Sequence, residues 1–194
     1  MIFICCKKRI FVVIYNYINI YVKEMNFKMN IILHEPEIPQ NTGNIGRTCV
    51  ATGTSLHLIE PLGFKIDDKS LKRAGMDYWK DLDVHYYTNF QDFLNKNPNA
   101  NIYMATTKAL NTYSDIKFKD DDFIMFGSEG SGIPEEILLH YKDNSIRIPM
   151  LEQYRSLNLS NSVAIVLYEA LRQNSFKGCQ MEGHLHRHSW SEAE

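Results

Sequence analysis

A short loop in the last quarter of the chain concentrates side chains that can form hydrogen bonds. Five of its seven residues are polar: Arg155, Ser156, Asn158, Ser160 and Asn161. The loop follows a short apolar strand pattern at 145–148 and precedes an apolar run at 163–171 that is typical of a buried helix. Because loops after strands commonly hold ligands in α/β proteins, we interpret it as a ligand site. The alternative is a polar connection whose Ser160 and Asn161 only cap the helix.

Two further motifs combine glycine with groups that could contact a polar ligand. In NTGNIGR, residues 41–47, a tight turn begins a helix and Arg47 could face a phosphate or an electron-rich oxygen. A capped helix with a surface arginine explains this motif equally well, and it lacks the ending of a P-loop. In FGSEGSGIP, residues 126–134, glycines would let a ligand approach the backbone while Glu129 accepts hydrogen bonds. This motif lacks the glycine order of dinucleotide-binding loops, and a glycine-rich turn without function is the alternative.

Positive charge gathers in one stretch, where aromatic residues follow closely. The stretch contains Lys65, Lys69, Lys72, Arg73, Tyr78 and Trp79. Cations beside aromatic rings suit a single-stranded RNA loop, although most charge runs are only solvated surface. The net charge of -2 excludes a strong overall basic field but leaves room for such a local patch.

Composition favours one buried domain in a reducing compartment. The chain has 194 residues, of which 44% are hydrophobic, enough for one well-formed core. Its four cysteines have no metal or disulfide-framework spacing, which is typical of the cytoplasm. We expect no designed metal site, since the tail histidines His184, His186 and His188 lack a supporting acid or cysteine.

Residues 1–28 differ from the rest of the chain. A basic start and an interrupted apolar run resemble a signal peptide, but no small-residue cleavage site follows. The run is also too short to cross a bilayer. We therefore predict an N-terminal extension outside the fold, and a native start at Met25 or Met29.

Strand and helix patterns alternate from residue 29 to residue 177, which predicts one domain with a mostly parallel α/β sheet flanked by helices. This pattern alone suggests an ordinary doubly wound sheet. Residues 178–194 lack an apolar pattern and are expected to form a frayed tail. The predicted strands are 30–34, 56–59, 84–87, 102–106, 123–126 and 145–148, and the predicted helices are 42–52, a short one opening at 67, 90–94, one from 134 and a final one ending near 172.

Taken together and in order, these motifs resemble the SPOUT superfamily of RNA methyltransferases, and within it the small tRNA 2′-O-methyltransferases of the TrmL or YibK type. The resemblance spans about residues 30–176 and rests on EPEIP-NTGNIGR, IEPLGF, DDK-L-RAG-DYW, FGSEGSGIP and IPM-RSLNLSNSVAIV-YEA. It implies a C-terminal deep trefoil knot, which is rare among folds. It also implies a cytoplasmic homodimer, whose active sites are completed across the two copies, acting on the tRNA anticodon loop and not at a membrane.

The resemblance further implies a reaction and its residues. S-adenosylmethionine would donate a methyl group, without a metal, to the ribose 2′-hydroxyl of nucleotide 34, a cytidine or a modified uridine. Methylation of another tRNA or rRNA position, a non-catalytic RNA-binding protein of this fold, and an ordinary nucleotide-binding protein are the alternatives. The implied active-site residues are Asn41, Arg47, Glu129, Ser156 and Asn158; those holding the methyl donor are Ala105, Gly127, Ile148 and Ser156; those contacting tRNA are Lys69, Lys72, Arg73 and Arg155.

Overall fold

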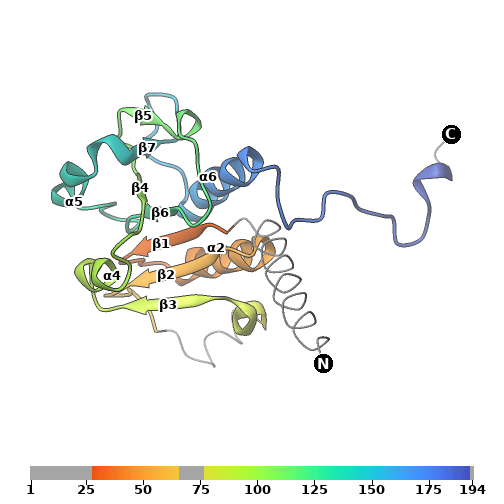
Figure 1. Cartoon of the computed structure of the whole chain (residues 1–194), viewed down its shortest axis with the longest axis horizontal. Coiled ribbons are helices and arrows are strands. Elements are labelled where there is room, and N and C mark those ends of the chain that lie inside the picture. The colour runs from red at the N-terminus through yellow and green to blue at the C-terminus, as the bar shows by residue number, and fades with distance from the viewer. Residues whose placement is uncertain (1–27, 66–76, 193–194) are drawn as a thin grey trace, which may run out of the picture.

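The central element of the protein is a seven-stranded parallel sheet (Figure 1). A computed structural model describes residues 28–65 and 77–192 of the chain. The predicted α/β class is confirmed. The strands are β1 (Asn30–His34), β2 (Ser55–Ile59), β3 (Val84–Tyr87), β4 (Ile102–Ala105), β5 (Asn111–Thr112), β6 (Phe123–Phe126) and β7 (Ser145–Arg147).

The strand order, β3-β2-β1-β6-β4-β7-β5, departs from an ordinary doubly wound sheet. The common doubly wound order places the fourth strand beside the first. Here β6 lies between β1 and β4, so that Phe126 is in register with Leu33 on one side and with Ala105 on the other. The plain doubly wound arrangement suggested by the alternating pattern is therefore wrong, because that pattern contains no information about which strands become neighbours.

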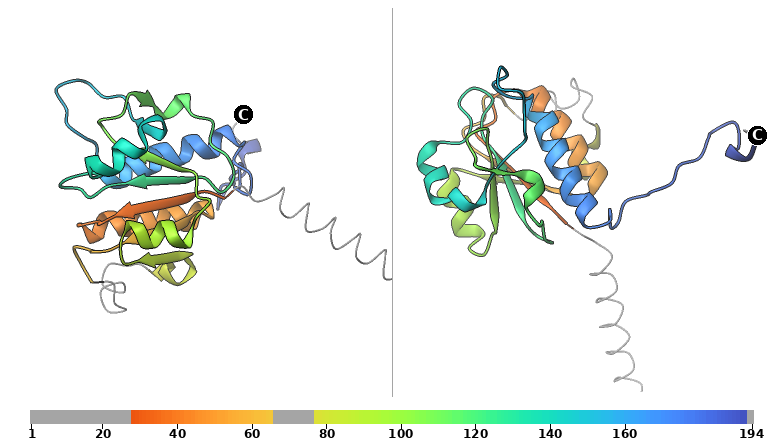
Figure 2. Two further views of the ribbon diagram at one scale, coloured as in Figure 1. Left: turned by 60° about the vertical axis from the view of Figure 1, so that its left-hand side comes forward. Right: turned by 90° about the horizontal axis from the view of Figure 1, so that it is seen from above.

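Helices cover both faces of the sheet. In Figure 2, α6 and α2 run side by side on one face, while α4 and α5 lie on the other. The α-helices are α2 (Pro39–Thr52), α4 (Phe90–Lys96), α5 (Glu135–His140) and α6 (Leu159–Gln173), and the 3-10 helices are η1 (Asp77–Asp81), η2 (Tyr113–Asp115), η3 (Lys142–Asn144) and η4 (Trp190–Glu192).

The apolar core has two parts, one on each face of the sheet. Ile31 and Leu33 pack with Ile45 of α2 and with α6. Ile32, which points to the opposite face, packs with Phe93 of α4. Every residue of β1 is buried, as expected for a parallel strand that is covered by helices on both sides.

Helix α2 begins earlier than predicted. Its first residue is Pro39, not Thr42, and the predicted loop residue Asn41 lies in its first turn. Proline suits this first position, because its missing N–H would have no partner inside the helix. The helix ends at Thr52 as predicted, and Gly53 follows in the left-handed conformation with a φ of 66°.

Helix α6 also differs from the prediction at two points. Its N-cap is Asn158, whose side chain accepts from two backbone N–H groups, and not Ser160 or Asn161. Ile165, predicted to be buried, is 37% exposed, and the neighbouring Tyr168 is 49% exposed. One stripe of α6 therefore faces away from the core.

Beyond α6, the chain runs away from the body of the molecule and carries only the short η4 between residues 174 and 192 (Figures 1 and 2). The predicted helix opening at residue 67 lies outside the described residues, as does the N-terminal segment up to residue 27. None of the described helices is long and apolar enough to cross a membrane.

Candidate active site

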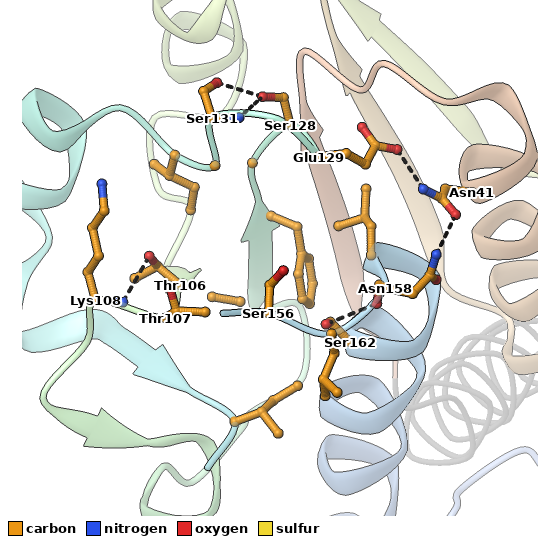
Figure 3. Close-up of a pocket in the computed structure, with 18 of the residues that line it drawn as sticks. Asn41, Thr106, Thr107, Lys108, Ser128, Glu129, Ser131, Ser156, Asn158 and Ser162 are labelled. Carbon is orange, nitrogen blue, oxygen red and sulfur yellow. Dashed lines mark hydrogen bonds between the residues drawn. The ribbon is translucent and has the colours of Figure 1, made fainter. Parts of the chain in front are cut away.

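A cavity of about 470 Å³ lies at the carboxyl ends of β4, β6 and β7 (Figure 3). Four segments line it. They are residues 105–108 after β4, residues 126–133 after β6, parts of the chain from 146 to 166 that include the start of α6, and the beginning of α2 at Ile38 and Asn41. Ligands of parallel α/β sheets commonly bind at this edge, where strand order changes.

The loop after β6 is folded so tightly that its backbone forms one wall of the cavity. A Cβ on Gly127 would lie 2.0 Å from the carbonyl carbon of Gly132, so no other residue fits at this position. Gly132 itself has a φ of 73°, and its N–H donates to the oxygen of Ser128 at 2.9 Å. A hydrogen bond of 2.7 Å between the hydroxyls of Ser128 and Ser131 crosses the same turn.

Glu129 binds the start of α2 from this loop. Its carboxylate accepts from the backbone N–H of Glu37 at 2.8 Å and of Ile38 at 3.3 Å. Ile38 is the N-cap of α2 and has no side chain able to cap the helix. A carboxylate from 91 residues further along the chain thus satisfies N–H groups at a helix N-terminus, where negative charge is stabilising.

A chain of side-chain hydrogen bonds connects Glu129 to α6. Asn41 Nδ2 donates to Glu129 at 2.8 Å, and Asn158 Nδ2 donates to Asn41 Oδ1 at 3.0 Å (Figure 3). Asn158 Oδ1 then accepts from the backbone of Ser160 at 3.0 Å and of Asn161 at 3.3 Å. Both amide orientations follow from chemistry, because a carboxylate can only accept and a backbone N–H can only donate. We call this series the Glu129–Asn41–Asn158 chain.

The structure brings most of the predicted site residues together. Four predicted active-site residues and all four residues predicted to hold the methyl donor line the same cavity. They are Asn41, Glu129, Ser156 and Asn158, and Ala105, Gly127, Ile148 and again Ser156.

Arg47 does not line this cavity. It is exposed on α2, and its guanidinium carbon lies 4.8 Å from the centre of the Tyr78 ring. The Tyr78 hydroxyl donates to the oxygen of Gly43 at 2.6 Å, which fixes the ring against the same helix. Arg155 is exposed and lies outside the lining as well, while the proposed tRNA-binding Lys69, Lys72 and Arg73 fall outside the described residues.

Sequence reasoning missed the polar residues that directly follow β4. Thr106, Thr107 and Lys108 all line the cavity, and Lys108 Nζ lies 2.6 Å from the Glu135 carboxylate. The hydrogen bond from Lys108 lowers the pKa of Glu135. Their position after a buried strand was a usable signal, because the carboxyl ends of parallel strands meet at one edge.

Two buried titratable groups away from the cavity, Cys49 and His57, are uncharged at neutral pH. Burial raises the pKa of Cys49 to about 12, so this thiol is not a nucleophile at neutral pH. Burial lowers the pKa of His57 to about 3, and its ring nitrogens lie 2.9 Å from the Tyr87 hydroxyl and 3.3 Å from Asn30 Oδ1. Within residues 28–65 and 77–192, no His, Cys, Asp and Glu side chains form a group that could hold a metal ion.

Comparison with known proteins identifies the family. Residues 28–168 match the SpoU rRNA Methylase family. The chain belongs to this family. It is 46% identical over 150 residues to the tRNA (cytidine(34)-2'-O)-methyltransferase of Saccharophagus degradans, and the match covers 77% of this chain and 97% of that protein. The resemblance inferred from the motifs is thereby confirmed.

Solved structures of the family have the same fold. One, described as "Structural insights into the 2-OH methylation of C/U34 on tRNA", is 39% identical with a TM-score of 0.72, covering 77% of this chain and 97% of that one. An AdoMet-bound rRNA methyltransferase from Sinorhizobium meliloti is 26% identical with a TM-score of 0.65, covering 75% of this chain and 56% of that one. AdoMet is S-adenosylmethionine, the methyl donor that the motifs imply.

Proposed function

We propose that this protein transfers a methyl group from S-adenosylmethionine to the ribose 2′-hydroxyl of nucleotide 34 of tRNA, a cytidine or a modified uridine. The observation that carries the proposal is the convergence of Asn41, Glu129, Ser156 and Asn158 on one cavity in a chain of the SpoU family. The relative from Saccharophagus degradans, matched over 97% of its length, is named for this reaction.

The cavity fits a methyl donor of this size and chemistry. Its volume of about 470 Å³ is within the usual range of small-molecule sites. The Cβ position of Gly127 is occupied by the backbone of Gly132 and Ile133, and the tight turn that this glycine allows places backbone groups along the cavity. Backbone groups at Ala105, Gly127 and Ile148, together with Ser156, would hold the donor, which supplies an electrophilic methyl group on a sulfonium.

Catalysis in this site would rest mainly on positioning. In-line methyl transfer needs the hydroxyl, the methyl group and the leaving sulfur in one line, and holding reactants in such geometry lowers the barrier substantially. The Glu129–Asn41–Asn158 chain would supply the rigidity, because it joins the wall after β6 to the starts of both α2 and α6. In this role Glu129 holds a wall of the site, and Ser156 points into the cavity (Figure 3).

Arg47 would act on the cavity of a second copy of the chain. It is exposed and lies outside its own cavity, and α6, which packs against α2 on the same face of the sheet, exposes Ile165 and Tyr168. A homodimer that packs through this face would cover the apolar side chains and complete each site. The guanidinium of Arg47 suits orientation of the phosphate next to the ribose and stabilisation of the forming alkoxide, since its planar fork of N–H donors matches phosphate and alkoxide oxygens.

The proposal extends to topology and to the RNA contact. Placement of β6 between β1 and β4, with β7 beyond β4, supports a deep trefoil knot in the C-terminal half. We assign the anticodon-loop contact to Lys69, Lys72, Arg73 and Arg155, and the site of action to the cytoplasm. Charge reversal at these cations should weaken tRNA binding and reduce its dependence on salt.

The direct test is methyl transfer from radiolabelled S-adenosylmethionine to an unmodified tRNA transcript, with the product mapped by position. We expect a 2′-O-methyl group at nucleotide 34 and none on a matched transcript carrying 2′-deoxyribose there. Label at another nucleotide would overturn the assignment of position. Calorimetry that detects ATP or NAD binding but no S-adenosylmethionine binding would overturn the assignment as a methyltransferase.

A further inference from the structure

Glu37 and Glu129 bind each other's loops reciprocally. The Glu37 carboxylate accepts from the backbone N–H of Gly130 at 3.1 Å, while the Glu129 carboxylate accepts from the backbone N–H of Glu37 at 2.8 Å. Each of these two acids thus accepts from a backbone N–H of the other's segment, although the segments are more than 90 positions apart. Hydrogen bonds from N–H groups to a carboxylate are stronger than those between neutral groups.

The backbone around Glu37 is also held by residues at the end of β2 and just beyond it. Gly63 donates its N–H to the oxygen of Pro36 at 2.9 Å, and a Cβ on Gly63 would lie 2.7 Å from the Cα of Glu37. Glu35 has a φ of 51°, which is unfavourable for a residue with a side chain, and its N–H donates to the oxygen of Ile59 at 2.9 Å. Such a conformation persists only where the surroundings hold it in place. The backbone of Glu37 is therefore held in place, which limits where its side chain can reach.

The Glu37 side chain lies directly against the glycine-rich loop. A Cβ built on Gly130 would be 3.0 Å from a carboxylate oxygen of Glu37. The φ of Gly130 is not positive, so its lack of a side chain matters here for space. The same loop provides Gly127, Ser128 and Glu129 to the wall of the cavity.

We infer that Glu37 is a positioning residue for methyl transfer, whose carboxylate holds the glycine-rich loop at the distance from α2 that the methyl donor requires. This inference rests on the proposed function. Glu37 is exposed, so losing its contact leaves the Gly130 N–H free to bind water and costs the fold little. The cavity wall, however, loses the contact between Glu37 and Gly130 and keeps the contacts of Glu129 with the start of α2.

The test compares Glu37→Ala, Glu37→Gln, Gly130→Ala and the double variant Glu37→Ala/Gly130→Ala in the full-length protein. We expect Glu37→Ala and Gly130→Ala each to weaken S-adenosylmethionine binding, measured by calorimetry, by about three- to tenfold with an unchanged unfolding midpoint. Glu37→Gln keeps an oxygen that can accept from Gly130 and should bind nearly normally. Because both substitutions break the same contact, the double variant should be no weaker than either single one. Glu136→Ala, an exposed acid on α5, is the matched control and should leave binding unchanged.

Three results would overturn the inference. They are normal binding by Glu37→Ala, equal loss in Glu37→Gln and Glu37→Ala, or additive losses in the double variant. Each presupposes that the unmodified protein binds S-adenosylmethionine. Failure of the unmodified protein to bind it would count against the proposed function instead, so the two failures are distinguishable.

Discussion

Substitution of Asn158 separates two roles that this residue combines. Its Oδ1 caps α6 by accepting from the backbone of Ser160 and Asn161, and its Nδ2 donates to Asn41 across the cavity. Asn158→Ala removes both contacts. Asn158→Asp keeps an oxygen for the cap, but its other carboxylate oxygen cannot donate to Asn41 Oδ1, so two acceptors face each other. Asn41 cannot donate to it instead, because its amide nitrogen already donates to Glu129.

The expected stabilities follow from these contacts. Loss of an N-cap costs about 1 kcal/mol, and loss of the hydrogen bond to Asn41 about another 1 kcal/mol, so Asn158→Ala should lower the free energy of unfolding by about 2 kcal/mol. In Asn158→Asp the negative charge at the helix start contributes about 0.5 kcal/mol and offsets much of the lost bond. We expect this variant within about 1 kcal/mol of the unsubstituted protein. Both variants should bind S-adenosylmethionine more weakly, because both break the Glu129–Asn41–Asn158 chain.

Urea unfolding followed by fluorescence, at one protein concentration, measures the free energy of unfolding. Calorimetry measures the affinity for S-adenosylmethionine. Asn89→Ala is the matched control. Asn89 caps α4 by accepting from Asp92 N at 2.8 Å, on the other face of the sheet, so its loss should cost about 1 kcal/mol without changing binding. Normal binding by Asn158→Asp would refute the role of the chain, and a stability as low as that of Asn158→Ala would refute the capping argument.

Three further predictions concern other parts of the molecule. Because burial lowers the pKa of His57 from 6.5 to about 3, the folded protein keeps this ring neutral while the unfolded chain takes up a proton below pH 6.5. The free energy of unfolding should therefore decrease by about 1.6 kcal/mol as the pH falls from 6.5 to 5, and His57→Gln should reduce this slope in urea titrations; an equal slope would contradict the assignment. Gly127→Ala should abolish S-adenosylmethionine binding in calorimetry, because its Cβ would overlap Gly132, whereas Gly53→Ala, with open space around it, should cost about 1 kcal/mol and bind normally. Arg47→Lys should lower turnover on tRNA by at least about tenfold without changing S-adenosylmethionine affinity; near-normal turnover would show that the guanidinium fork is not needed.

The sequence predicted the ends of helices and strands well where residues next to those ends determine them. The end of α2 at Thr52 was predictable, because Gly53 directly follows and provides the left-handed cap. Its start at Pro39 was missed: proline at the first helical position was a usable signal, but the N-cap Ile38 has no capping side chain, and the carboxylate at this end comes from Glu129, far along the chain. The cap of α6 is a different case, because it is local: Asn158 was interpreted as a site residue, and its side-chain oxygen also accepts from two N–H groups of the helix.

The candidate site shows the same limit at a larger scale. A glycine motif and a polar loop pointed to Glu129 and Ser156 through chemistry that is apparent locally, whereas Asn41 and Gly127 were implied by the family resemblance of the motifs. These residues lie close together because β6 lies between β1 and β4. The residues of a strand do not indicate which other strands will be its neighbours in the sheet. Lys108 was missed for a related reason, since an exposed lysine after a strand looks like ordinary surface until the neighbouring loops are known.

The central place of β6 also has a consequence for how the chain can be made. β1, β2 and β3 come from residues 30–87 and β4 from residues 102–105, but the strand that joins these two groups spans Phe123–Phe126. A nascent chain that stops before Phe123 therefore has one three-stranded fragment, in which β1 is an open edge able to pair with another chain, and a single strand, β4, whose partners β6 and β7 are not yet made. The sheet becomes continuous only when a late segment enters its middle, which is a slow, non-local step. This order of events makes the growing chain, more than the finished protein, the state that is most exposed to aggregation.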